Sequence, residues 1–249
     1  MERTELTRIK QLFGNNLIGP AELLSQSVSQ SGLAHAVSQW GLALAVRSAE
    51  PKASDLTEGP GPSVTPSANT SANDLRLSIP PLNYSWDYLE QHAQDYLLIL
   101  GQSSINGVDI TLRNLRTIFG IDPAQSEPCF YNQDWYLNET FIDTKLEDRW
   151  YLLKKDVFET SRAVMPQELL EKEISFPSAI LCAYTFFAYY LHYNEPLWYH
   201  DFIWCSDVDH NGDRIYVGKY HDIDGVNKNG FSIHRHLALR PCYAAVDAL

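Results

Sequence analysis

The feature that most limits how this chain can fold is a pair of strand-like segments on either side of Asn211-Gly212. Residues 202–208 and 214–220 are rich in β-branched and aromatic residues, and Asn-Gly between two such segments is the strongest two-residue hairpin signal. The sequence therefore predicts an antiparallel hairpin over residues 202–220. A two-residue turn at Asn211-Gly212 gives it two favourable cross-strand pairs, Asp209 with Arg214 and Val208 with Ile215.

A long apolar segment precedes this hairpin. Pro177-Ser178 is a helix-start signal, because the Ser hydroxyl can cap a helix, and residues 179–192 are apolar on nearly every face. Such a helix is predicted to lie in the middle of the core. A second Asn-Gly pair, Asn229-Gly230, precedes a further strand over residues 231–237. A helix followed by strands, without regular βαβ alternation, indicates an α+β fold with a central buried helix and antiparallel hairpins.

Two shorter elements are predicted upstream of that helix. Residues 96–100, YLLIL, followed by Gly101, are typical of a buried strand or of the end of a helix, and the pattern does not decide between them. Thr111 is a candidate N-cap for a helix through Phe119, with apolar residues on one face and Gly120 as its stop.

The chain divides into three zones by composition. Residues 1–46 carry helical signals, including the apolar spacing of Leu6, Ile9, Leu12 and Phe13, and are predicted to form a small helical module. Residues 47–78 are rich in Pro, Ser and Thr and hold almost no large apolar residue, so they are predicted to be a flexible linker. Residues 79–249 then form the α+β domain.

The net charge of −12 disfavours non-specific binding to nucleic acid or to anionic membranes, since both depend on an excess of Lys and Arg. No apolar segment reaches the ~18 residues of a membrane helix, and the charged start does not resemble a secretory signal. A cytoplasmic location and no membrane partner are therefore expected. The acids Glu127, Asp134, Glu139 and Asp143 lie in a loop-rich stretch and are predicted to be solvated.

Two patterns raise the question of a divalent metal; no other cofactor is predicted. Residues 207–213 have the oxygen-ligand spacing of a calcium loop, but Gly218 stands where a bidentate Glu is needed, so an Asp-rich turn is the preferred interpretation. His234 and His236 are two apart on a predicted strand and project from one face, with Arg235 facing the other way. Together with Asp222 they are a candidate zinc or iron site, the alternative being histidines that pack or hydrogen-bond.

Aromatic residues gather in and before the hairpin. Aromatic faces line sugar and peptide sites, but the same residues can equally form the core of an aromatic-rich fold. The candidate ligand-binding residues are Trp198, Trp204, Tyr216 and Tyr220.

The tail carries short motifs in a characteristic order, namely Phe176-Pro177-Ser178, an apolar helix, Phe202-Ile203-Trp204-Cys205-Ser206, Ile215-Tyr216-Val217, 225–230 (GVNKNG) and Leu239-Arg240-Pro241-Cys242. This order resembles the C-type-lectin-like domains at the C-termini of many uncharacterised bacterial proteins, over about residues 175–249. The segment 229–237 is longer than in those domains. The whole chain, with IGPAEL and EPCFYNQDWYLNE, is also similar to a family of uncharacterised bacterial proteins without an assigned activity.

The resemblance implies a scaffold whose loops set the ligand, although a fold alone does not imply a function. The leading hypothesis is a non-enzymatic module that binds a protein or a small-molecule ligand. One alternative is a metal-dependent enzyme that uses His234 and His236. The other is a nucleic-acid-associated protein that binds through the N-terminal helices.

Overall fold

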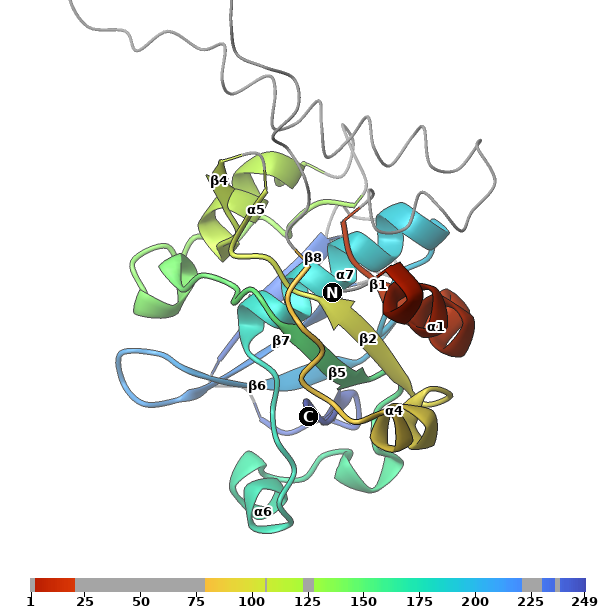
Figure 1. Ribbon diagram of the computed structural model, residues 1–249. Coiled ribbons are helices and arrows are strands. Elements are labelled where there is room, and N and C mark those ends of the chain that lie inside the picture. Colours follow the sequence, from red (N-terminus) through yellow and green to blue (C-terminus); the bar gives the residue numbers. More distant parts are fainter. Residues whose placement is uncertain (1–2, 21–78, 106, 123–127, 221–229, 236–237) are drawn as a thin grey trace, which may run out of the picture.

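The computed structural model describes residues 3–20, 79–105, 107–122, 128–220, 230–235 and 238–249 (Figure 1). In this part of the chain two mixed sheets enclose a central helix, which confirms the predicted α+β class. The first sheet has the strand order β1-β2-β5 and the second β8-β7-β6-β9, with a separate two-stranded hairpin β3-β4. The elements are α1 (Arg3–Phe13), β1 (Leu17–Ile18), α4 (Trp86–His92), β2 (Tyr96–Leu100), β3 (Ser104–Ile105), β4 (Val108–Asp109), α5 (Leu112–Phe119), β5 (Trp150–Lys154), α6 (Pro166–Glu171), α7 (Ala179–Tyr193), β6 (Phe202–Val208), β7 (Arg214–Tyr220), β8 (Gly230–His234) and β9 (Tyr243–Ala244), with 3₁₀ turns at Gly14–Asn16, Thr140–Asp143 and Glu159–Ser161.

Helix α7 lies between the two sheets, as its all-round apolar sequence predicts (Figure 1). The Ser178 hydroxyl caps it by accepting the N–H of Leu181 (3.2 Å), which confirms the predicted helix start. One side of α7 packs on β1, β2 and β5, and the other on β6, β7 and β8. Because both sides of the helix are covered by sheet, it has no solvent face along most of its length.

Strand β2 settles the choice that the YLLIL segment left open. It pairs antiparallel with β5 and parallel with β1. Leu97 and Ile99 face α7, while Leu98 and Leu100 lie in the core under α1 and α4. A strand buried on both faces reads as a continuous apolar run, which is why alternation did not identify it.

The described N-terminal residues belong to the same fold rather than to a module of their own. Helix α1 follows the predicted spacing, and Ile9 and Phe13 pack in one core with Leu98 and Trp150. After it Leu17–Ile18 forms β1 on the edge of β2, a strand that the sequence did not predict. Residues 21–46 of the predicted module and the predicted linker 47–78 lie outside the described residues.

The predicted hairpin is confirmed as β6-β7, but its register is not the predicted one. Asp209 donates its N–H to the Asp213 carbonyl (2.9 Å) and its carbonyl accepts the N–H of Gly212 (3.0 Å). With Gly212 at φ 87°, this is a three-residue loop closed by a bulge, where a two-residue turn was expected. Val208 therefore pairs with Arg214, and a second irregularity follows before Trp204 pairs with Tyr216.

The outer edge of β8 is covered by residues 129–135. Tyr131 N–H donates to the Phe231 carbonyl, and Phe231 N–H donates to the Cys129 carbonyl, each over 2.8 Å. Beyond them the Gln133 side chain accepts the N–H of Ile233 (3.2 Å), and the Trp135 indole donates to the Ile233 carbonyl (3.0 Å). Side chains thus continue the ladder where backbone pairing ends, and the edge strand is not left open.

Candidate functional site

Two of the predicted ligand-binding residues, Trp204 and Tyr216, are core residues. They lie on the face of β6 and β7 that points away from α7, with ring centroids 5.0 Å apart, and pack with Phe202 and Tyr243. Tyr216 is 1% exposed, so its ring offers no surface to a ligand. Their aromatic character serves the packing of this sheet against the region of α6. Tyr220 ends β7, and its side chain lies outside the described part of the structure.

His234 packs against the same aromatic cluster. Its ring stacks on Tyr216 (centroids 5.6 Å apart) and meets the edge of Phe202 (5.3 Å). Burial lowers its pKa to about 4, so the imidazole is neutral at pH 7. His236 and Asp222 lie outside the described residues, and the predicted metal site stays a prediction.

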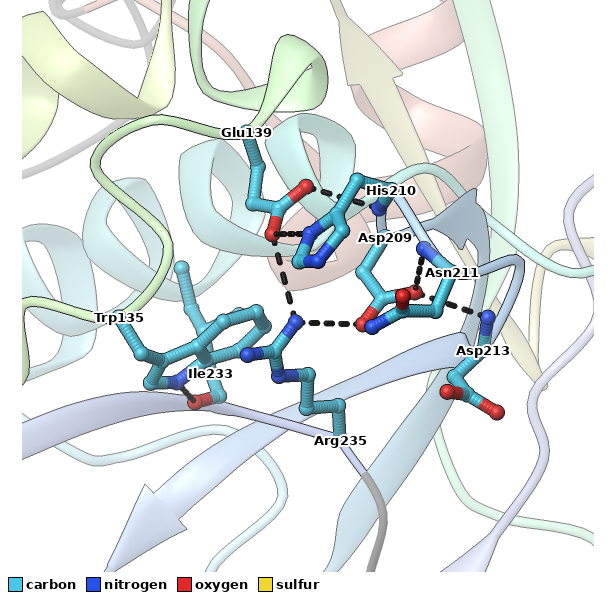
Figure 2. A network of polar contacts seen from close by, with 8 residues as sticks. All are labelled: Trp135, Glu139, Asp209, His210, Asn211, Asp213, Ile233 and Arg235. Carbon is cyan, nitrogen blue, oxygen red and sulfur yellow. Dashed lines mark hydrogen bonds and ion pairs between the residues drawn. The ribbon is translucent and has the colours of Figure 1, made fainter.

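Arg235 faces the other side of β8, as the alternation of the strand predicts, and enters a polar network at the hairpin tip (Figure 2). Its Nη1 lies 2.5 Å from Asp209 Oδ2 and 3.4 Å from Glu139 Oε1. The guanidinium carbon lies 4.5 Å from the centroid of the Trp135 ring, a cation–π arrangement. The arginine therefore joins the covering segment, the hairpin and β8.

Asp209 is the buried centre of this network. Besides Arg235 it binds two backbone N–H groups of its own turn, those of Asn211 (2.8 Å) and Asp213 (2.9 Å), through Oδ1. Removal from water raises the pKa of Asp209, but the hydrogen bonds from Asp213, Arg235 and Asn211 outweigh that effect and hold the pKa at about 2. The carboxylate is thus charged, each of its oxygens accepts a hydrogen bond, and the two bonds to Oδ1 set the shape of the loop.

Glu139 completes the network and corrects a prediction. Its carboxylate accepts the backbone N–H of His210 at Oε2 (2.9 Å) and contacts His210 Nδ1 at Oε1 (2.7 Å). The side chain is 6% exposed, whereas the sequence predicted a solvated acid. Of the other acids in that stretch, Asp134 and Asp143 are exposed as predicted, and Glu127 lies outside the described residues.

The network holds three groups of the kind that bind metals. Ligand atoms of Glu139, Asp209 and His210 lie within 4.8 Å of one another. The Arg235 guanidinium, however, already bonds to both carboxylates and brings a positive charge to the position of a cation. Asp207, the first position of the calcium-like pattern, is directed elsewhere, because it accepts the N–H of Ala179 (2.6 Å) at the start of α7. These contacts therefore hold the tip of the hairpin against Glu139 and Arg235.

Trp198, the remaining predicted ligand-binding residue, is also a core residue (6% exposed), but it borders a pocket of about 370 Å³. The pocket lies between the segment after β5 and the segment that joins α7 to β6. Trp198 and His200 have φ values of 52° and 70°. A bulky side chain in this left-handed region is uncommon and strained. The lining residues are Lys155, Asp156, Val157, Glu159 and Arg162 from the segment after β5, Tyr189 from α7, and Pro196, Leu197, Trp198, Tyr199 and Asp201 from the segment before β6.

The walls of this pocket are tied together by hydrogen bonds. The Trp198 indole donates to the Lys155 carbonyl (2.9 Å). Arg162 donates to both carboxylate oxygens of Glu159 (2.7 and 2.8 Å) and to both of Asp201 (2.6 and 3.5 Å). The hydrogen bonds with Glu159 and Asp201 raise the pKa of Arg162, and the Arg162 bond lowers the pKa of Glu159. Both groups therefore keep their charges throughout the neutral range.

The charged residues of the pocket were not predicted from the sequence. They come from two segments that α6 and α7 separate, and no spacing rule links Glu159 and Arg162 to Asp201. The one local signal is the run of Trp198, Tyr199, His200 and Asp201 beyond the end of α7.

Comparisons with protein-family models, with curated proteins and with solved structures found no match to this chain. The likeness of residues 175–249 to C-type-lectin-like domains accordingly stays a prediction. Among the helices in the described part of the chain, none is both long and apolar enough for a membrane span.

Proposed function

We propose that this chain is a non-enzymatic binding module and that the pocket beside Trp198 receives a small-molecule ligand. The observation that carries the proposal is the left-handed backbone of Trp198 at the wall of a polar pocket. Such a conformation costs about 1–3 kcal/mol and persists only where the surroundings impose it, typically at ligand sites. The ring is held there by its bond to the Lys155 carbonyl.

The composition of the pocket supports binding rather than catalysis. Three aromatic residues, Tyr189, Trp198 and Tyr199, combine with charged groups in a concave site, so the pocket offers both apolar contact and polar groups that can orient a ligand. General acid–base catalysis needs a group whose pKa lies near the working pH. The pKa shifts of Arg162 and Glu159 run away from neutrality, so these groups suit the fixed orientation of a ligand. The lectin-like resemblance, as an analogy, points to the same kind of function.

The proposal is tested by a ligand-observed NMR screen of the full chain against a mixed library of small cations, anions and neutral polar compounds. Tyr199 is 43% exposed at the pocket, so Tyr199→Ala removes a contact surface without opening the core. We expect hits whose affinity falls about five- to twentyfold in this variant, the loss expected for one aromatic contact.

Met165→Ala is the matched control, because Met165 is 50% exposed and does not line the pocket. It should bind every hit like the unaltered chain. A library without hits, or hits that bind equally to Tyr199→Ala, would contradict the proposed site.

A further inference from the structure

The charged groups around Arg162 can accept hydrogen bonds from a ligand, but the guanidinium has no donor left for one. A guanidinium has five N–H donors. Arg162 uses one on each oxygen of Glu159, two on Asp201, and one on the Pro241 carbonyl (3.3 Å). It has none left for a ligand. Each carboxylate oxygen of Glu159 and Asp201 accepts one of these bonds and keeps further acceptor capacity.

The charge of the pocket is also one-sided. Its lining holds three carboxylates, those of Asp156, Glu159 and Asp201, and two cations, Lys155 and Arg162. Asp156 is exposed and has no ion pair among the described residues. A surplus of negative charge and of acceptors favours a ligand that is cationic and donates hydrogen bonds. The overall charge of −12 adds a long-range attraction for such a ligand.

The aromatic walls suit the same ligand. The Lys155 ammonium already lies 5.8 Å from the centroid of the Tyr189 ring, within the range of a cation–π contact. This places an ammonium group of the chain itself at the pocket wall. A ligand ammonium can make the same kind of contact with Tyr199, which borders the same pocket and is 43% exposed.

We propose that this pocket binds a primary alkylammonium group, with the carboxylates as acceptors and the aromatic rings as walls. The inference rests on the proposed function and specifies its ligand class. A primary alkylammonium group can come from two sources, a free aliphatic diamine or the side chain of a lysine in a peptide. In either case Lys155 opposes the ligand by charge repulsion.

The experiment is a calorimetric titration of the full chain with 1,4-diaminobutane at low salt. Butane-1,4-diol and butanedioate, of the same length, serve as neutral and anionic probes, and N-acetyl-lysine amide represents the peptide source. We expect both ammonium probes to bind at least tenfold more tightly than the diol and the dianion. If the diamine binds more tightly than the lysine amide, the source is a free amine, and the reverse order indicates a peptide.

Two variants of the pocket should change the affinity for the diamine in opposite directions. Asp156→Asn should weaken diamine binding about three- to fivefold, as the loss of one exposed ion pair predicts, and Lys155→Ala should strengthen it by a similar factor. Asp87→Asn makes the same change at an exposed residue outside the pocket and should leave the affinity unchanged. Circular dichroism establishes that each variant is folded.

The outcomes separate the inference from the proposed function. If the diol binds as tightly as the diamine, or if both Asp156→Asn and Lys155→Ala leave diamine binding unchanged, the ammonium proposal is wrong. The Trp198 pocket could then still be the binding site for another ligand class, as the Tyr199-dependent hits of the library screen would show. If neither these probes nor any library compound binds, both proposals fail.

Discussion

A single methyl group added at Gly218 should test whether the second sheet fixes the position of the pocket lining. Gly218 lies in β7 between Phe202 of β6 and Ser232 of β8. An ideal Cβ at Gly218 would lie 2.2 Å from the carbonyl oxygen of Asp201 and 3.1 Å from the Cα of Phe202. The first distance is more than 1 Å inside the ~3.5 Å separation of non-bonded heavy atoms. Both contacts are with backbone, so no side-chain rotation relieves the clash.

Gly218→Ala should therefore lower the free energy of unfolding by about 2–3 kcal/mol, the upper range for overpacking. For a chain of this size the expected fall in Tm is about 4–12 °C. Because the clash pushes on Asp201, a partner of Arg162, ligands of the pocket should also bind more weakly. Thermal unfolding followed by circular dichroism measures the first effect and calorimetric titration the second.

Gly101→Ala provides a matched control. Its added Cβ would lie 2.6 Å from the Tyr151 ring and 2.7 Å from the Glu147 carbonyl oxygen, and neither of these residues lines the pocket. This variant should lose stability but bind ligands normally when folded. A Gly218→Ala chain with the Tm and the affinity of the unaltered protein would refute the close approach of Asp201 to β7.

Two further predictions concern the second sheet. The unfolded chain protonates His234 at its ordinary pKa near 6.5, whereas the folded chain does so only at about 4. The contribution of neutral His234 to the free energy of unfolding should therefore be fully present above pH 6.5. It should fall by up to about 3 kcal/mol as the pH drops towards 4. Urea denaturation at several pH values should show a smaller fall for His234→Leu, and an equal fall would contradict the assignment. Asp209→Asn should cost about 2–4 kcal/mol, because Arg235 loses its buried charged partner. If the midpoint in urea does not move, the network is not what holds the hairpin tip.

Local signals explain which parts of the fold could be predicted. The Ser178 cap of α7 and the Thr111 cap and Gly120 end of α5 act within four residues, and all three are found in the structure. The hairpin register failed because the Asp209 side chain bonds to its own turn and stabilises a three-residue loop, which Asn-Gly alone does not encode. Residues 96–100 are apolar throughout, so their sequence fits a strand or a helix equally well. The packing of other elements on both faces identifies the segment as a strand.

The site depends on contacts that no local pattern encodes. Glu139 looks like a surface acid until His210 and Arg235, 71 and 96 residues away, supply its partners. Trp198 was predicted from its residue type alone. The aromatic pattern could not distinguish it from Trp204 and Tyr216. All three are buried, and Trp198 is set apart by the pocket that it borders, which no sequence pattern encodes.

The second sheet explains why the pocket has fixed walls. On one side, residues 196–201 lead directly into β6, and Tyr199 forms a bridge with Lys219 of β7. On the other side, the turn around Ser161 attaches to the chain at β9, since Ala163 N–H donates to the Tyr243 carbonyl (2.9 Å) and Ala245 N–H donates to Ser161 Oγ (2.8 Å). Strands β7 and β9 flank β6 in the sheet, so the two walls are held at a separation set by backbone pairing. Arg162 then joins them through Asp201. A pocket framed in this way should change little when a ligand enters, and its selectivity should follow from the groups already in place: an excess of carboxylates and three aromatic rings.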